Sequence, residues 1–153
     1  MPNGGNPGTP VRPYSAYGFV VRVDGVPAGH FTSCTGLEID ITPIAYREAG
    51  ANQIVHYFAG PVRYSPVTLH YGLTDSPELW DWFMTGLKGE TNYRNVTVAV
   101  LAPDGAKESI NWPLLRAWPC RWGGVGFDTL SHAMAIESLT IAYAQLERDP
   151  PGN

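Results

Sequence analysis

Charged side chains are scarce in this chain, and lysine is almost absent. Only 16% of the 153 residues are Asp, Glu, Lys or Arg, against about 25% in typical soluble domains, and Lys88 and Lys107 are the two lysines. The net charge of -4 argues against nucleic-acid binding through a basic patch. Aromatic residues and arginine are enriched at protein interfaces, so five Trp, eight Tyr and five Phe indicate that other subunits cover part of the surface.

Cysteine and long apolar runs are scarce as well. Cys34 and Cys120 are too few for a disulfide framework, and we expect two free thiols in a reducing compartment. No segment approaches the ~20 apolar residues needed to span a bilayer, so we expect no membrane insertion. The first residues lack a basic start followed by an apolar run, so we expect no secretory signal and synthesis in the cytoplasm.

Motifs for chemistry are also missing. The hydrolase motif G-x-S-x-G is absent, and no second cluster completes a zinc site around His30 and Cys34. Glu38 and Asp40 share a face of a predicted strand and are interpreted as its solvated side rather than a carboxylate pair. The Gly-rich run 123–126 lacks the G-K-[ST] ending of a phosphate loop. We predict no enzyme, no cofactor and no metal.

Most of the chain predicts a single domain, over residues 14–148. Residues 1–13 are rich in Gly, Pro and Asn and predict a flexible N-terminal arm. Residues 149–153, with two prolines and a glycine, predict a flexible tail.

Alternating apolar and polar residues predict a mainly β fold. The clearest alternation places Leu37, Ile39 and Ile41 on one face and is expected to stop at Pro43. Further strands are predicted, in chain order, at 19–23, 30–34, 53–58, 67–71, 96–100 and 109–112.

One helix is predicted between these strands. Ser76 is a plausible N-cap, and Pro77 suits the first helical position because it needs no N–H there. Lys88 suits the C-terminal end and Gly89 the left-handed stop. The apolar residues at helical spacing, with Trp82 expected in the core, are Leu79, Trp82, Phe83 and Leu87.

The segment 134–146 fits two structures. Ile136, Leu139, Tyr143 and Leu146 follow a helical stripe, whereas Thr140 and its neighbours alternate as in a strand. Together these patterns predict an antiparallel β-barrel or two packed sheets, with one helix packed outside.

The remaining tryptophans are candidates for contacts. Trp80 lies off the apolar stripe of the helix, and an exposed Trp on a helix often marks a contact site. Trp112, Trp118 and Trp122 suit packing against the sheet or a neighbouring subunit, and a sugar-binding platform is the alternative use.

An ordered set of short motifs runs through most of the chain. The motifs stand, in order, at 19–25, 35–38, 46–52, 60–64, 67–69, 72–75, 79–82, 94–96, 117–122 and 135–139. This ordered set resembles the inner tail-tube family of contractile phage tails and contractile injection systems, and the resemblance covers about residues 17–147.

The resemblance implies a small β-barrel of two packed sheets with one flanking helix, and it favours a strand over residues 134–147. It also implies hexameric rings that stack into a tube inside a contractile sheath, around a channel for DNA, a tape-measure protein or an effector. Implied partners are further copies of the chain, the sheath protein, and baseplate and tube-terminating proteins. The particle would be extracellular or anchored at a membrane.

The resemblance and the composition together suggest three groups of site residues. The long connection after the early strands would reach the adjacent ring, with contacts by Tyr46, Arg47, Glu48 and Asn52. Subunit-interface candidates are Trp80, Trp118, Arg121 and Trp122. Polar residues of the alternating strands are candidates for the channel wall, namely Glu38, Asp40, Thr68, Thr97 and Thr140.

The chain departs from the family pattern at residues 49–52, at Cys120 and Arg121, at 123–126, and in its last strand. Two alternatives therefore stay open. One is a baseplate-proximal tube initiator. The other is a small β-barrel that binds carbohydrate through Trp118 and Trp122.

Overall fold

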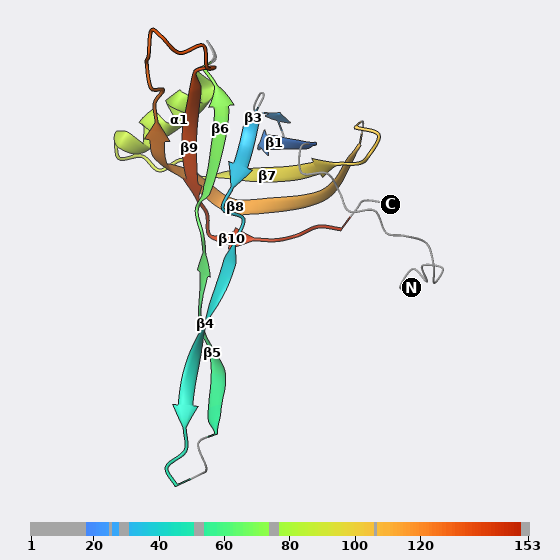
Figure 1. Cartoon of the computed structure of the whole chain (residues 1–153), viewed down its shortest axis with the longest axis vertical. Helices are drawn as coiled ribbons and strands as arrows, with labels where there is room; N and C mark the ends of the chain where they lie inside the picture. Colours follow the sequence, from blue (N-terminus) through green and yellow to red (C-terminus); the bar gives the residue numbers. More distant parts are fainter. Residues whose placement is uncertain are drawn as a thin grey trace.

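Two packed antiparallel sheets and one helix form the body of the molecule (Figure 1). The computed structural model describes residues 18–24, 26–27, 31–50, 54–73, 77–105 and 107–150. The elements are β1 (Phe19–Val23), β2 (Val26–Pro27), β3 (Phe31–Thr35), β4 (Ile39–Arg47), β5 (Val55–Tyr64), β6 (Val67–Gly72), α1 (Glu78–Leu87), β7 (Arg94–Leu101), β8 (Glu108–Gly123), β9 (Ile136–Ala142) and β10 (Gln145–Leu146). The predicted fold class is confirmed, and the segment 134–146 contains the strands β9 and β10 rather than a helix.

The two sheets share the long strand β8. Its first part pairs with β7 as far as Ala117, and its last part pairs with β9 from Trp118 to Gly123. The strand orders are therefore β2-β1-β7-β8 in one sheet and β8-β9-β6-β3 in the other. Between these parts Arg116 has a positive φ of 53°, where the strand passes from one sheet to the other.

The strand predicted at 109–112 is present, but its predicted length was wrong, because β8 runs from Glu108 to Gly123. Pro113 and Pro119 look like strand breakers in the sequence. Pro119 lies next to a register shift between β8 and β9, where a missing N–H is tolerated.

The core fills the space between the sheets with alternate residues of facing strands. This confirms the alternation predicted at 19–23, 67–71 and 96–100. The most deeply buried side chains are Val21, Val67, Leu69, Trp82, Val96, Leu114, Leu139 and Ile141. Burying side chains of this size contributes about 1.5–3 kcal/mol each, which makes the body the stable part of the chain.

Helix α1 closes one side of this core. Trp82 is buried as predicted, and its Nε1 donates a hydrogen bond to the carbonyl oxygen of Asn92 at 2.8 Å. Gly89 ends the helix with a φ of +88°. Pro77 is the N-cap rather than the first helical residue, because its carbonyl oxygen accepts the first helical hydrogen bond, from Asp81. Ser76 lies outside the described residues.

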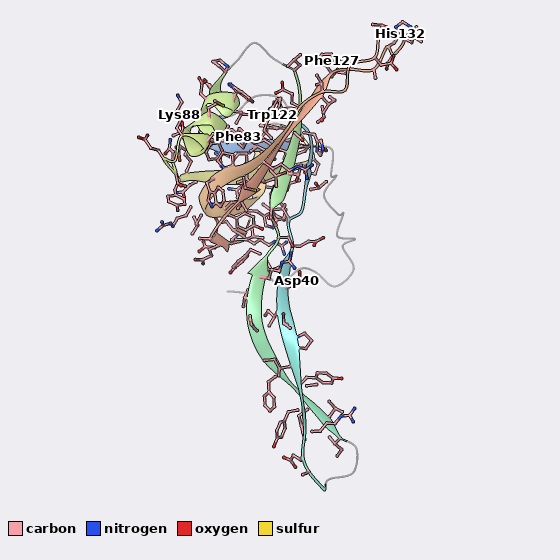
Figure 2. All side chains as sticks on the ribbon, turned by 90° about the vertical axis from the view of Figure 1, so that its left-hand side faces the viewer. Asp40, Phe83, Lys88, Trp122, Phe127 and His132 are labelled. Atoms are coloured by element: carbon pink, nitrogen blue, oxygen red, sulfur yellow. The ribbon has the colours of Figure 1, made fainter. Side chains whose placement is uncertain are left out.

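Strands β4 and β5 leave the body as a two-stranded ribbon, residues 39–64 (Figures 1 and 2). The prediction that Pro43 ends the strand was wrong, since β4 continues to Arg47. A register shift between Ile41 and Pro43 accommodates the proline, as at other bulges. Gly60 faces this irregularity, where an added Cβ would lie 2.5 Å from the carbonyl oxygen of Thr42, so only glycine fits.

The predicted terminal segments are only partly visible. Residues 1–13 lie outside the described part of the chain. In the predicted tail, Asp149 exchanges two backbone hydrogen bonds with Asn111, of 2.8 and 3.3 Å. The domain boundaries stay a prediction.

Candidate interaction surfaces

The ribbon exposes large apolar side chains to solvent. Ile44 of β4 lies opposite Phe58 of β5, and the Tyr46 and Phe58 rings meet edge to face at 6.2 Å. The exposed fractions of Ile44, Tyr46 and Phe58 are 50, 52 and 58%. These three residues form one apolar surface, called the ribbon face here. Such a surface on a monomer marks a protein contact site.

The predicted inter-ring residues lie at the far end of this ribbon. Tyr46 and Arg47 end β4, Glu48 follows it directly, and all three are exposed. Asn52 lies outside the described residues. Their role in contacts between rings stays a prediction.

Two of the predicted interface tryptophans contact each other within the chain. The ring centroids of Trp80 on α1 and Trp122 on β8 are 4.9 Å apart, at an interplanar angle of 73°. Trp122 is partly buried against the core, while Trp80 remains 41% exposed. Trp80 is therefore the member of this pair that a neighbouring chain can reach.

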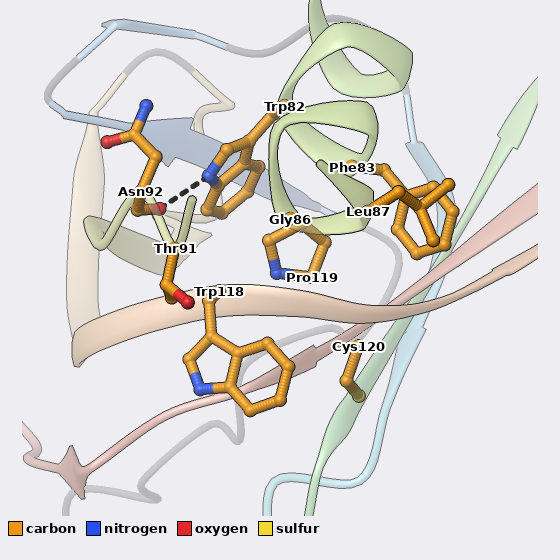
Figure 3. A pocket seen from close by; sticks show the side chains of 9 residues that line it. All are labelled: Trp82, Phe83, Gly86, Leu87, Thr91, Asn92, Trp118, Pro119 and Cys120. Carbon is orange, nitrogen blue, oxygen red and sulfur yellow. Dashed lines mark hydrogen bonds between the residues drawn. The ribbon is translucent and has the colours of Figure 1, made fainter. Parts of the chain in front are cut away.

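Trp118 lines a groove between α1 and β8 (Figure 3). The groove has a volume of about 180 Å³, and the end of the helix contributes Gly86 and Leu87 to it. Trp118, Pro119 and Cys120 line it from the strand side. Arg121 lies outside this lining and is paired with Thr140 of β9. The four predicted interface residues thus fall into three places: the Trp80–Trp122 pair, this groove and the β8–β9 pairing.

The sheet β8-β9-β6-β3 carries a polar face opposite the core. The Thr68 and Thr140 Oγ1 atoms are 3.0 Å apart across β6 and β9. On the same face, Ser33 Oγ and His70 Nδ1 are 3.0 Å apart. This polar face therefore consists largely of hydroxyl groups, and Arg121 sits at its margin beside Thr140.

The other predicted channel residues lie elsewhere. Thr97 is on β7, in the other sheet, between Arg22 and Pro113. Glu38 and Asp40 are exposed where the ribbon joins the body (Figure 2). The structure thus brings Thr68 and Thr140 together and separates them from the remaining three.

A further exposed surface escaped sequence analysis. Phe127, Leu130 and Met134, in the loop between β8 and β9, are 87, 88 and 72% exposed. Leu73 is also exposed and lies beside the end of this loop, where its N–H donates a hydrogen bond to the carbonyl oxygen of Ala135. These four residues are called the loop patch here. A signal was available, since Phe127 and Leu130 are large apolar residues in a segment of Gly, Asp, Ser and His.

The sheet β8-β9-β6-β3 has two edges without a partner among the described strands. One is the outer edge of β3, which pairs with β6 on its other side. The other is the last part of β8, which pairs with β9 beyond the reach of β7. Exposed edges invite further strand pairing, so they are candidate contact sites between copies.

The two thiols differ in their surroundings. Cys34 lines an apolar cavity of about 410 Å³ between the sheets, and burial raises its pKa to about 11. Cys120 is exposed on β8, and partial burial raises its pKa as well. In the part of the chain that the structure describes, no group of three or more His, Cys, Asp or Glu residues is placed to hold a metal ion. Helix α1, the helix of that part, is too short to cross a membrane.

One family model and several solved structures are similar to this chain. The family model of the T4-like virus tail tube protein gp19 matches residues 15–147. The sheath–tube complex of the extracellular contractile injection system PVC contains a chain with a TM-score of 0.81 and 23% identity, over 90% of this chain and 92% of that one. The tube-terminating cap of the anti-feeding prophage gives 0.86 and 19%, over 98% and 99%.

A more distant likeness is to Hcp1 from Flavobacterium johnsoniae, with a TM-score of 0.53 and 14% identity over 86% of this chain and 94% of that one. No curated protein matches the chain. At these identities the solved structures establish the fold, and the family model establishes the relationship.

Proposed function

Because this chain belongs to the T4-like virus tail tube protein family, we propose that it is a non-enzymatic subunit that forms stacked hexameric rings around a channel. The main observation that supports this proposal is the exposed ribbon. A two-stranded ribbon alone is at best marginally stable in water, and here all nine residues of β4 are exposed. Contact with another copy buries the ribbon face and stabilises the ribbon, as stacking of rings requires.

The two free strand edges support closure of a ring. In the order β8-β9-β6-β3 every pairing is antiparallel, so β3 and β8 run in opposite directions at the two ends of the sheet. The β3 edge of one copy therefore meets the β8 edge of the next as an antiparallel pair. Repetition around a ring pairs both edges in every copy, which leaves none open to uncontrolled pairing.

Ring closure of this kind joins the sheets of neighbouring copies into one wall. We place the polar face with Thr68 and Thr140 toward the channel, because its opposite face is the buried core. A wall of hydroxyl groups offers few strong binding sites, which suits the passage of DNA, a tape-measure protein or an effector. Thr97, on the other sheet, belongs to the outer surface in this arrangement.

The related structures suggest the partners. They come from a sheath–tube complex, a tube-terminating cap and a baseplate. By analogy we propose that this chain contacts a sheath protein, baseplate and terminating proteins, within a phage tail or an extracellular injection particle. The packing of Trp122 on Trp80 and the core favours this assembly role over a carbohydrate platform.

Electron microscopy of the purified full chain tests the proposal. Rings and tubes are expected for the wild-type protein at high concentration, with or without a sheath partner. Arg121→Glu is expected to reduce ring formation while circular dichroism stays unchanged. A chain that remains monomeric under all these conditions contradicts the proposal. Copy number per particle separates a tube subunit, present many times, from an initiator present in a single ring.

A further inference from the structure

The loop that carries Phe127, Leu130 and Met134 of the loop patch has local order of its own. Asp128 Oδ1 accepts a hydrogen bond from the Leu130 N–H at 2.9 Å, and Ser131 Oγ accepts one from the Ala133 N–H at 3.2 Å. Asp128 is the single charged residue between 124 and 135. The Leu130 side chain is thus presented on a locally ordered backbone, in a segment with few charges.

The loop and the ribbon project from opposite ends of the molecule. In Figure 2 the ribbon extends downward from Asp40, and the loop that carries Phe127 and His132 extends beyond the body at the other end. The molecule therefore has one apolar protrusion at each end of its long axis: the ribbon face and the loop patch.

We propose that the loop patch receives the ribbon face of a second copy of this chain in the adjacent ring. This inference rests on the proposed stacking of rings and adds the surface on which the ribbon docks. When identical copies stack head to tail along their long axis, the ribbon of one and the loop of the next enter the same gap from opposite sides.

The ribbon is long enough to contact a second copy. The nine residues of β4 span about 30 Å at the usual rise per residue, which carries Tyr46 well beyond the body of its own copy. Ile44, Tyr46 and Phe58 meet Leu73, Phe127, Leu130 and Met134, and both surfaces lose apolar area to solvent. Neither set contains a charged residue, so the apolar part of the contact buries no charge.

Serine substitutions separate this contact from ring closure. Phe127→Ser/Leu130→Ser and Tyr46→Ser/Phe58→Ser are each expected to lower the apparent stacking affinity about tenfold or more, while rings still form. Since these side chains are exposed, melting temperatures should stay at the wild-type value. The matched control is Leu87→Ser, a similarly exposed leucine on α1, and it should leave stacking unchanged.

Cross-linking identifies the partner surface directly. In a background without Cys34 and Cys120, the double variant Phe58→Cys/Leu130→Cys is treated with a short bis-maleimide under tube-forming conditions. Because every copy then offers one thiol to each neighbouring ring, a ladder of linked chains longer than six is expected. A single variant has one thiol per chain and can form dimers at most, and neither single variant should form them; a dimer from Leu130→Cys alone would place the loop against another loop and overturn the proposal.

The docking surface and the proposed function can be contradicted separately. If wild-type tubes form but the double variant gives no ladder and the serine variants stack normally, the docking surface is wrong and the proposed function stands. If the wild-type chain forms no rings or tubes, the proposed function itself is wrong. Loss of stacking in the ribbon variant alone shows that the ribbon docks on another surface of the adjacent ring, and also overturns the proposal.

Discussion

At the scale of single residues, the two thiols predict different reactivities. Burial raises the pKa of Cys34 from 9.0 to about 11, so the reactive thiolate is about a hundredfold rarer near neutral pH than for an ordinary cysteine. Cys120 is exposed, and although partial burial raises its pKa too, its access to solvent is greater. Alkylation with iodoacetamide at pH 8 followed by mass spectrometry should therefore label Cys120 first.

The Cys120→Ser variant is the control for this measurement, and it should take up the label slowly until the chain is denatured. Equal labelling rates at both sites in the folded wild-type protein would contradict the packing described around Cys34.

Tyr71 predicts a loss of stability at high pH. Burial, followed by the nearby charge of Glu137, raises the pKa of Tyr71 from 10.0 to about 12. Folding thus favours the neutral phenol, and this contribution to the free energy of unfolding is complete below pH 10 and lost as the pH rises through 12. The melting temperature of the wild-type protein should fall over this range, and less steeply for Tyr71→Phe. Parallel curves for the two proteins would be inconsistent with this role.

Substitution of Gly36 is expected to lower the free energy of unfolding, and Gly105 serves as the control position. Its φ is +97°, and an added Cβ would collide with the carbonyl oxygen of Pro66. Gly105 also has a positive φ, of +72°, but open space around it. Gly36→Ala should therefore cost about 3 kcal/mol or more in the free energy of unfolding, against about 1 kcal/mol for Gly105→Ala. Chemical denaturation measures both, and equal costs would contradict the close approach at Gly36.

At the scale of elements, the sequence predicted the helix and those strands whose positions depend on residues close together in the chain. The spacing of Trp82 and its apolar neighbours predicted α1, and the alternation at 67–71 predicted the central strand β6. The extents of β4 and β8 depended on pairing with another strand, β5 and β9 respectively, which overrode Pro43 and Pro119 as breakers.

The candidate interaction surfaces were predicted less completely. A face of a strand becomes such a surface when no other part of the same chain covers it, and the alternation of residues does not show whether it is covered. Ile39 and Ile41 alternate as core residues do, yet both are exposed on the ribbon. Thr97 alternates like Thr68, but the pairing of β7 places it in the other sheet. Sequence periodicity indicates a face and leaves open which partner, in the same chain or another, covers that face.

The ribbon is expected to differ from the body in the rate of amide hydrogen exchange. In the free chain its backbone is held by one pairing alone, so amides of β4 and β5 should exchange with solvent faster than those of β6 and β9. Assembly should slow the exchange of ribbon amides by at least about tenfold, since docking adds burial there. Hydrogen-exchange mass spectrometry on monomer and tube compares the two states, with β6 as the internal control.

The Arg47→Ala variant extends this comparison. Arg47 ends β4 in an exposed position, so its removal should leave exchange in the monomer unchanged. We expect Arg47→Ala to reduce the extent to which assembly slows the exchange of the ribbon amides. A variant that exchanges faster throughout β6 and β9 would instead mean that Arg47 supports the fold.

At the scale of the whole molecule, the chain combines a stable body with surfaces that one copy leaves exposed. The body buries a continuous core, while the ribbon face, the loop patch and two strand edges remain open. Membership of the tail tube family and these open surfaces lead to the same conclusion, that the complete unit is an assembly of many copies.

Cryo-electron microscopy of the purified wild-type chain tests that conclusion most directly. The account predicts six-fold rings, joined edge to edge through β3 and β8 and stacked with the ribbon of each copy on the next ring. Well-folded monomers at every concentration, or rings in which the ribbons remain free in solvent, would contradict it.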